Sequence, residues 1–281
     1  MYKIIDTHCH IYPGQIAQKA VEAVDRFYDH LPSYHHDGTV ETLVKTGLSS
    51  GISHFIVHSV ATTPRQVSTI NRFIAASVEQ SGGRFTGMGT MHLDSDSLSR
   101  DLDEIQSLGL MGVKLHPDIQ RFHIDDPRAM EIFGMCEERG LPVCVHTGDY
   151  RYDYSNPPRT EKVLKAFPDL TLIGAHFGGW SVWEEAMETL SGYPNLIVDT
   201  SSTFFKISTY LALQLINAYG PDRIMFGTDY PLWKQKVEID YLLHLNLPEE
   251  DYDKIFWKNA CRIFKIRPET LVLPDEPKET R

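Results

Sequence analysis

Short runs of apolar residues recur along the chain, and each is followed by a stretch in which apolar residues return every three or four positions. The first pattern is typical of buried β-strands, and the second of helices with one buried face. Eight runs of the first kind begin at Lys3, His54, Phe85, Gly112, Pro142, Thr171, Leu196 and Arg223. The alternation therefore predicts repeated strand and helix units.

Helical periodicity fills most of the intervals, and capping residues support it. Thr39 precedes Thr42 at a helix start, and Asp126 precedes Pro127 at a first helical position. The predicted helices are Thr39–Ser49, Gln66–Glu79, Ser97–Leu108, Pro127–Arg139, Val182–Leu190, Ile207–Ala218 and Glu249–Phe264.

Strands that alternate with helices favour a parallel sheet, and eight repeats favour its closure into a barrel. We therefore predict an α/β fold, a single (β/α)₈ TIM barrel, with an open doubly wound sheet as the alternative. The barrel is placed at residues 1–267. Residues 268–281, rich in Pro, Glu and Lys, are predicted to form a loose C-terminal tail.

Polar residues stand at the ends of several predicted strands. The first strand ends in Asp-Thr-His-Cys-His with His8 and His10, the fifth in His146, the sixth in His176 and the eighth in Asp229. All strand carboxyl ends of such a barrel open on one face, so these side chains should converge. Three imidazoles and a carboxylate from His8, His10, His146 and Asp229 predict a divalent metal site, with Zn²⁺ as first choice and Mn²⁺ or Fe²⁺ as alternatives.

Other histidines compete for these roles. His58, His92 and His116 also end strands. His176 precedes a glycine-rich turn that leaves space above its ring, so we interpret it as a group that orients substrate or moves protons. Alternatively, His176 is a further metal ligand or a histidine that forms a hydrogen bond behind the ligands.

Lys114 and His116 share one side of their strand and are predicted to face the barrel mouth. A buried lysine needs a negative partner. Three explanations remain open: Lys114 binds a substrate carboxylate, or it is carbamylated and bridges two metals, or it forms a salt bridge with a neighbouring acid. Arg151 is a second candidate to clamp a carboxylate, against the alternative of a solvated loop residue. The segment Tyr28 to Gly38 is either a mobile lid or disordered.

Charge and cysteine content restrict the partners. The formal net charge is -11, which repels nucleic acid and anionic lipid surfaces. No apolar stretch approaches the ~18 residues of a membrane helix. The four cysteines lack CxxC spacing, so we expect reduced thiols and a cytoplasmic location. A small molecule is therefore the expected partner, and a homo-oligomer is left open.

Two motif matches carry no function. Gly47-Leu-Ser-Ser-Gly51 fits G-x-S-x-G but lies between a helix and the next strand, whereas a nucleophile elbow joins a strand to a helix. Gly87-Met-Gly89 lacks the third glycine of a dinucleotide-binding loop.

The chain resembles the amidohydrolase superfamily, in the branch that includes aminocarboxymuconate semialdehyde decarboxylase. The resemblance extends from Ile4 to Phe264 and rests on the motifs at residues 6–10, 112–117, 145–146, 175–179 and 226–231. It implies that His8, His10, His146 and Asp229 bind metal and that His176 is the catalytic acid or base. It also implies that carbamylated Lys114 is a route to a second metal.

The reaction predicted from these residues is hydrolysis of a small ester, lactone or amide by a metal-activated water, with Asp229 accepting its proton. The alternative is non-oxidative decarboxylation of a small unsaturated or aromatic acid, because this branch contains both activities with similar ligands. A non-catalytic metal-binding scaffold is a third hypothesis, and His176 beside the ligands argues against it.

Overall fold

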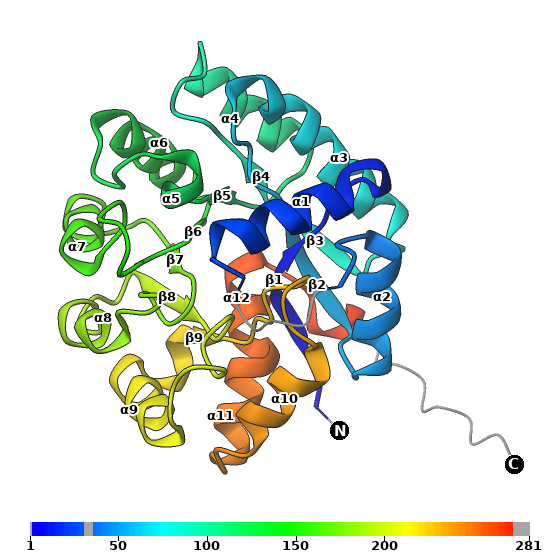
Figure 1. Cartoon of the computed structure of the whole chain (residues 1–281), viewed down its shortest axis with the longest axis vertical. Helices are drawn as coiled ribbons and strands as arrows, with labels where there is room; N and C mark the ends of the chain where they lie inside the picture. The colour runs from blue at the N-terminus through cyan, green and yellow to red at the C-terminus, as the bar shows by residue number, and fades with distance from the viewer. Residues whose placement is uncertain (1, 31–35, 272–281) are drawn as a thin grey trace, which may run out of the picture.

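The computed structural model describes residues 2–30 and 36–271 of the chain. Parallel strands form the centre of the molecule, and helices surround them (Figure 1). The strands are β1 (Ile5–His10), β2 (His54–His58), β3 (Phe85–Gly87), β4 (Gly89–Thr90), β5 (Val113–Leu115), β6 (Val143–Val145), β7 (Leu172–Gly174), β8 (Leu196–Asp199) and β9 (Ile224–Met225).

The strands close into a barrel. β1, β2 and β3 form one sheet and β4 to β9 the other, and only Met88 separates β3 from β4, so these two are one barrel strand. At the seam between the first and last strands, the Thr7 amide donates to the Phe226 carbonyl at 2.9 Å and the His10 amide to the Tyr230 carbonyl at 2.8 Å. The predicted (β/α)₈ TIM barrel is confirmed.

The barrel interior holds a layer of apolar side chains. Ile56, Cys144 and Ile197 belong to this layer, and Ala260, Phe264 and Leu271 of the C-terminal region join it. Each of these three strands carries a polar residue two positions after its apolar one: His58 in β2, His146 just after β6, and Asp199 in β8. Since alternate strand residues share a face, the layer above the apolar one is polar. The chemistry of the barrel therefore lies at the carboxyl ends of its strands.

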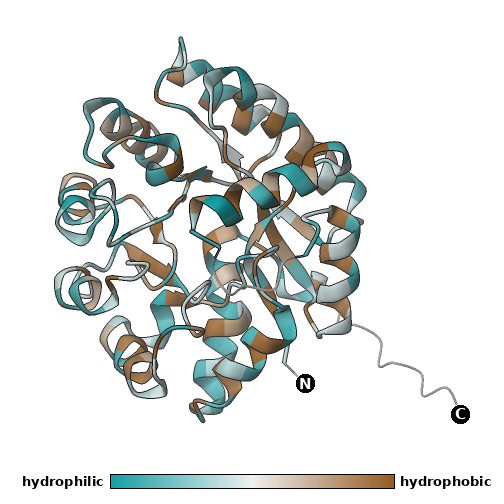
Figure 2. Ribbon diagram, in the orientation of Figure 1, coloured by the Kyte–Doolittle hydropathy of each residue, from teal (hydrophilic) through white to brown (hydrophobic). Residues whose placement is uncertain are grey.

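The helices lie outside the strands and turn their apolar residues inward (Figure 2). Their bounds are α1 (Gly14–Phe27), α2 (Val40–Ser49), α3 (Val67–Gln80), α4 (Leu98–Ser107), α5 (Pro117–Gln120), α6 (Pro127–Glu138), α7 (Pro157–Ala166), α8 (Trp183–Leu190), α9 (Thr209–Tyr219), α10 (Gln235–Leu243), α11 (Glu249–Asp253) and α12 (Asn259–Phe264). None of the helices in residues 2–30 and 36–271 is both long and apolar enough to span a membrane.

The predicted helices and caps agree with the structure apart from a few features. The side chain of Thr39 accepts from the Thr42 amide, and that of Asp126 from the Arg128 amide. The predicted helix Glu249–Phe264 is divided by a π-helical turn at Lys254–Lys258. Helices α1, α5, α7 and α10 are not among the predicted helices. Helix α1 crosses the barrel mouth in Figure 1.

Two predicted segments fall partly outside the described residues. Residues 31–35, within the predicted lid at Tyr28 to Gly38, are not described, and neither are residues 272–281 of the tail. The first tail residues pack on the barrel: the Lys3 Nζ donates to the Pro268 carbonyl at 2.9 Å, and Leu271 is only 5% exposed. All four cysteines are free thiols and buried.

One buried acid predicts a pH dependence of stability. Glu238 of α10 is 1% exposed, and burial, with the charges of Asp6 and Asp229, raises its pKa from 4.5 to about 8. The folded state therefore keeps a proton that the unfolded chain releases above pH 4.5, so stability falls as pH rises through that window. In metal-free protein, Glu238→Gln should raise the free energy of unfolding at pH 8.5 by a few kcal/mol, at about 1.4 kcal/mol per pH unit, and change it little at pH 4.5. Urea unfolding at both pH values measures this, and equal gains at both would contradict it.

Candidate metal centre

Two histidines of β1 and one aspartate after β9 bring three donor atoms together. The pairing of β1 with β2 shifts register between Asp6 and Cys9, so that His8 lies within this irregularity and His10 just after it. Both imidazoles line the cavity at the barrel mouth. The Nε2 atoms of His8 and His10 lie 3.2 Å apart. The Oδ1 atom of Asp229 lies 3.4 Å from the first and 3.6 Å from the second. These distances suit side chains that share one ion.

A buried carboxylate orients His8. The Nδ1 of His8 lies 2.9 Å from the Oδ2 of Asp199, so a proton on Nδ1 leaves the Nε2 lone pair facing the other donors. Asp199 also accepts from the amides of His176 and Ser201, each at 3.1 Å. The sequence interpretation gave Asp199 no role, although it ends a predicted strand as the ligands do.

Asp229 is held in an uncommon backbone conformation. Its φ is +59°, in the left-handed region that few non-glycine residues adopt, and such strain clusters at functional sites. Ser202 donates to its Oδ2 at 2.5 Å, and Trp233 donates to the Ser202 oxygen at 2.7 Å. Burial raises the pKa of Asp229 to about 6, against the opposing Ser202 hydrogen bond. In the metal-free protein, the carboxyl therefore exchanges a proton near neutral pH.

His146 and His176 form a second pair. The Nδ1 of His146 lies 3.0 Å from the Nε2 of His176, whose own Nδ1 lies 2.9 Å from the Ser201 carbonyl oxygen. Burial lowers the pKa of His176 to about 4, so its ring is neutral at pH 7 with a proton on Nδ1 and a lone pair on Nε2. Its ring stacks on that of His8 with centroids 5.2 Å apart. His176 thus links His146 to the first three donors.

The environment keeps the histidines in the form that binds metal. Burial, reinforced by the charge of Lys114, lowers the pKa of His8 and His10 well below the ordinary value. Burial does the same for His146. Neutral imidazoles offer a lone pair without first losing a proton, so these side chains are prepared to act as ligands.

Lys114 is completely buried, and its Nζ contacts His8 Nε2 at 3.2 Å and Cys144 Sγ at 3.5 Å. No acid within residues 2–30 and 36–271 lies at ion-pair distance from it. The interpretation of Lys114 as one half of a salt bridge therefore has no partner in this part of the chain. A buried ammonium without an acidic partner in the described chain can instead pair with an anion that enters from outside.

His116 lines the same cavity, but both of its ring nitrogens are engaged. Its Nδ1 accepts from the Ile119 amide at 3.3 Å, and its Nε2 lies 3.0 Å from the hydroxyl of Tyr28. The Tyr28 hydroxyl also lies 3.4 Å from His146 Nδ1. Tyr28, which sequence reasoning treated only as the start of a loop, thereby connects two strand ends.

Arg151 lies apart from the other predicted site residues. Its guanidinium pairs with both carboxylate oxygens of Asp149, at 2.7 to 3.2 Å, and donates to Asp29 and to the Phe27 carbonyl. It does not line the cavity that contains the histidines. Its contacts fix the end of α1 instead, and the structure brings it to no free carboxylate-binding position.

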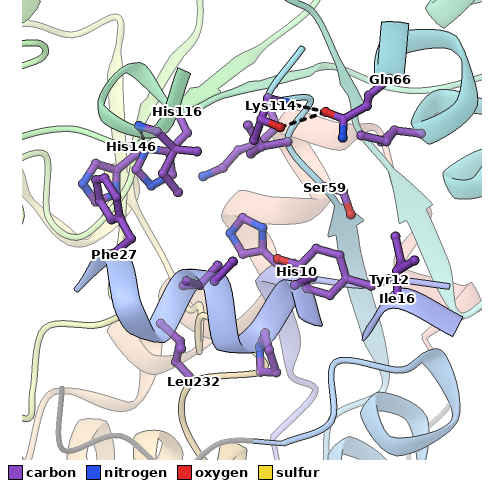
Figure 3. Close-up of a pocket in the computed structure, with 18 of the residues that line it drawn as sticks. His10, Tyr12, Ile16, Phe27, Ser59, Gln66, Lys114, His116, His146 and Leu232 are labelled. Carbon is purple, nitrogen blue, oxygen red and sulfur yellow. Dashed lines mark hydrogen bonds between the residues drawn. The ribbon is translucent and has the colours of Figure 1, made fainter. Parts of the chain in front are cut away.

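A cavity of about 570 Å³ reaches the donors from outside. His8, His10, Lys114, His176 and Asp229 line its inner end, together with His116 and His146. Figure 3 shows His10 and Lys114 pointing into this space, His116 and His146 side by side with Phe27 of α1 next to them, and Ile16 of α1 at the other end. A small molecule in the cavity can therefore touch all the predicted site residues except Arg151.

An orphaned histidine supports the view that this site holds a cation. His58 is fully buried, and neither ring nitrogen has a hydrogen-bond partner in the described chain. Its ring lies edge-on to those of His8 and His10, with centroids 4.9 and 4.5 Å away, and the three rings offer nitrogens within 4.8 Å of one another. Buried polar atoms without partners are rare, and a bound ion would satisfy this one. The imidazole and carboxylate donors fit a divalent metal.

This arrangement predicts a role for His58 in metal affinity. Replacing it with phenylalanine keeps the ring volume but removes the nitrogens, so metal affinity should fall about 10- to 100-fold. Chelator competition followed by metal analysis measures the dissociation constant directly. His92→Phe, at a strand-end histidine outside the cavity, is the matched control. Equal affinities for the two variants would show that His58 is only a packing residue.

Comparison with known proteins decides the family. A sequence profile described as Amidohydrolase matches residues 5–266, nearly the whole chain. The chain belongs to the Amidohydrolase family. This confirms the resemblance seen in the motifs at the strand ends.

One curated relative of this Amidohydrolase is γ-resorcylate decarboxylase from Polaromonas sp. (strain JS666), 31% identical over 116 residues. That match covers 36% of this chain and 36% of the relative. A 2-amino-3-carboxymuconate-6-semialdehyde decarboxylase from Dictyostelium discoideum is 32% identical over 79 residues, 27% of this chain and 22% of the relative. The chain thus matches only about a third or less of the curated relatives' length.

Solved structures share the whole fold. An uncharacterised TIM-barrel protein from Bordetella bronchiseptica has 25% identity and a TM-score of 0.78 over 94% of this chain and 98% of its own. A dihydroxybenzoic acid decarboxylase from Polaromonas sp. JS666, with bound manganese and 2-nitroresorcinol, has 17% identity and a TM-score of 0.71 over 96% and 99%. A putative 2-pyrone-4,6-dicarboxylic acid hydrolase from Pseudomonas putida has 18% identity and a TM-score of 0.66 over 94% and 98%. Decarboxylases and a hydrolase therefore share this barrel.

Proposed function

We propose that this Amidohydrolase is a metal-dependent decarboxylase of a small aromatic or unsaturated carboxylic acid. Lys114 carries the proposal, because it is a buried cation without an acidic partner in the described chain, and it lines the cavity beside His8. A substrate carboxylate placed there would gain a charge-assisted hydrogen bond. The decarboxylase names of the relatives support this choice over the hydrolysis first predicted from the sequence.

His8, His10 and Asp229 would hold the divalent cation, with His146 as the fourth predicted ligand. When bound, the cation supplies Lewis-acid stabilisation of negative charge on the substrate. The donor set accepts Mn²⁺ as well as Zn²⁺. Manganese in the Polaromonas decarboxylase structure favours Mn²⁺ over the zinc preferred from sequence.

The residues of the chain divide the remaining work. Lys114 holds the substrate carboxylate. The protonated Asp229 carboxyl gives its proton to the substrate carbon that is bonded to this carboxylate. The bond from that carbon to the carboxylate then breaks, CO₂ leaves, and the bonding electrons return to the ring, so one proton is consumed for each CO₂. His176, neutral and fixed by Ser201, is placed to orient a ring hydroxyl or to return a proton.

Hydrolysis of a lactone, ester or amide is the second candidate function. The raised pKa of Asp229 supports it. A carboxylate with a pKa of about 6 can also take a proton from water and return it to a leaving group. The similar fold of the putative Pseudomonas putida hydrolase is compatible with this chemistry. Both candidates use a small-molecule substrate in the same cavity.

The two candidates give different products. The Mn²⁺-loaded protein should release ¹³CO₂ from carboxyl-labelled 2,6-dihydroxybenzoate or a related hydroxybenzoic acid, and a chelator should stop the release. Lactones and esters of the same size serve as the parallel panel. Metal-dependent hydrolysis of that panel with no CO₂ from any acid would overturn decarboxylation in favour of hydrolysis.

A further inference from the structure

One face of helix α1 forms a wall of the cavity. Lining positions Ile16, Lys19, Ala20, Ala23, Val24 and Phe27 recur at three- and four-residue spacing. The adjacent face packs on the protein through Ala17 and Val21, which are 2% and 7% exposed. Helix α1 therefore carries apolar residues on the side that faces the cavity as well as on the side that packs on the barrel.

Helix α3 supplies the facing wall. Its lining residues Thr69, Ile70 and Phe73 follow Gln66 at the same helical spacing. Ile119 of α5 joins them. In Figure 3, Ile16 and Tyr12 lie on the same side of the cavity as Gln66, away from His116 and His146. The cavity thus continues as an apolar groove from the polar residues to a rim between α1 and α3.

The groove exposes apolar surface that packing does not explain. Ile16 is 51% exposed, the largest exposed fraction among the large aliphatic side chains of the described residues. A single ring with a carboxylate would fill roughly a third of the 570 Å³ at the packing density of protein interiors. The rest is space of the size that larger, mostly apolar ligands occupy.

We infer that the substrate carries an apolar tail, an alkyl chain or a second ring, which lies in the groove between α1 and α3 while its acid head meets Lys114. This rests on the proposed function for the head group only. The tail belongs to the same molecule, because the groove and the metal-site residues line one continuous cavity. Exposed Lys19 and Gln66 mark the rim, so the apolar part ends there.

A substrate series tests the inference on the metal-loaded protein. 2-Hydroxybenzoic acids with unbranched alkyl chains of increasing length should show kcat/KM rising up to about fourfold for each added CH₂, until the chain reaches the rim. CO₂ release is the readout, with the unsubstituted acid as reference. A flat or falling series would overturn the inference while CO₂ release itself upheld the proposed decarboxylation.

Variants locate the tail. Ala20→Phe fills the groove, and the ratio of kcat/KM for the long-chain acid to that for the unsubstituted acid should fall at least about tenfold. Ile16→Ser removes apolar surface at an exposed position, where folding is not at risk, and should lower the same ratio about threefold. Gln18→Phe, on the exposed face of α1 outside the cavity, is the matched control. Unchanged ratios in both groove variants would place the tail elsewhere and overturn the inference.

The outcome also separates the two proposals. If no acid released CO₂ but esters or lactones were hydrolysed with the same rise along the tail series, the groove would stand and decarboxylation would fall. If neither class of compound showed a chain-length dependence, the groove assignment would fall whatever the reaction.

Discussion

Replacing Asp229 with asparagine should lower kcat by about three orders of magnitude. The substitution keeps the shape of the side chain and its contact with Ser202, but an amide cannot give or take the proton that the reaction moves. His8 and His10 still offer their nitrogens, so the variant should retain part of its metal. Steady-state kinetics with metal analysis of the same sample measures both quantities.

Asp96→Asn is the control, because Asp96 is an exposed aspartate. It should leave turnover and metal content unchanged. An Asp229→Asn variant that kept full activity with full metal would remove Asp229 from the chemistry. Loss of activity together with complete loss of metal would assign it to metal binding alone.

Replacing Lys114 with methionine should lower kcat/KM for the acid substrate about 100- to 1,000-fold. Methionine keeps an unbranched side chain of similar length in a completely buried position, so the fold should tolerate it better than a truncation. The variant loses the buried positive charge that is proposed to bind the substrate carboxylate, an interaction worth about a few kcal/mol at a buried position. The loss should be found in kcat/KM for carboxylates and not for neutral esters.

Lys19→Met is the matched control, since Lys19 lines the same cavity but is exposed. Metal content resolves the alternative in which a carbamate on Lys114 bridges two metals. In that case the native protein holds two ions per chain and Lys114→Met holds fewer. One ion in both proteins, with the kinetic loss present, supports the carboxylate-binding role.

Sequence patterns predicted the barrel and most of the residues at its mouth. Eight repeats of strand and helix predicted that the sheet closes into a barrel. This closure brings together His8 from the first strand and Asp229 from the end of the last strand. Helix α1 is absent from the predicted helices, although Ile16, Ala20 and Val24 recur at the four-residue spacing of a helix face.

Other features depend on contacts that no local pattern reveals. Asp199 could have been suspected from its position at a strand end, but its bond to His8 comes from two strands paired only through the closed barrel. Arg151 faces α1 and Asp149 instead of the cavity, which depends on how the loop after β6 folds. In the sequence, His58 was one of several strand-end histidines that could bind metal. The structure distinguishes it, because its ring lies beside His8 and neither nitrogen has a hydrogen-bond partner in the described chain.

The reaction itself was the least accessible from sequence. Hydrolysis and decarboxylation share ligands and a proton-carrying carboxyl, so the motifs favour neither. Our proposal of decarboxylation rests on the absence of an acid at ion-pair distance from Lys114 in residues 2–30 and 36–271, which only the three-dimensional arrangement shows.

The most direct test of the account is anomalous diffraction from crystals of the protein, recorded on both sides of the manganese and zinc absorption edges. We expect an anomalous peak within coordination distance of the Nε2 atoms of His8 and His10 and a carboxylate oxygen of Asp229. A protein fully loaded with metal by elemental analysis, but with its ion bound away from these three side chains, would contradict it.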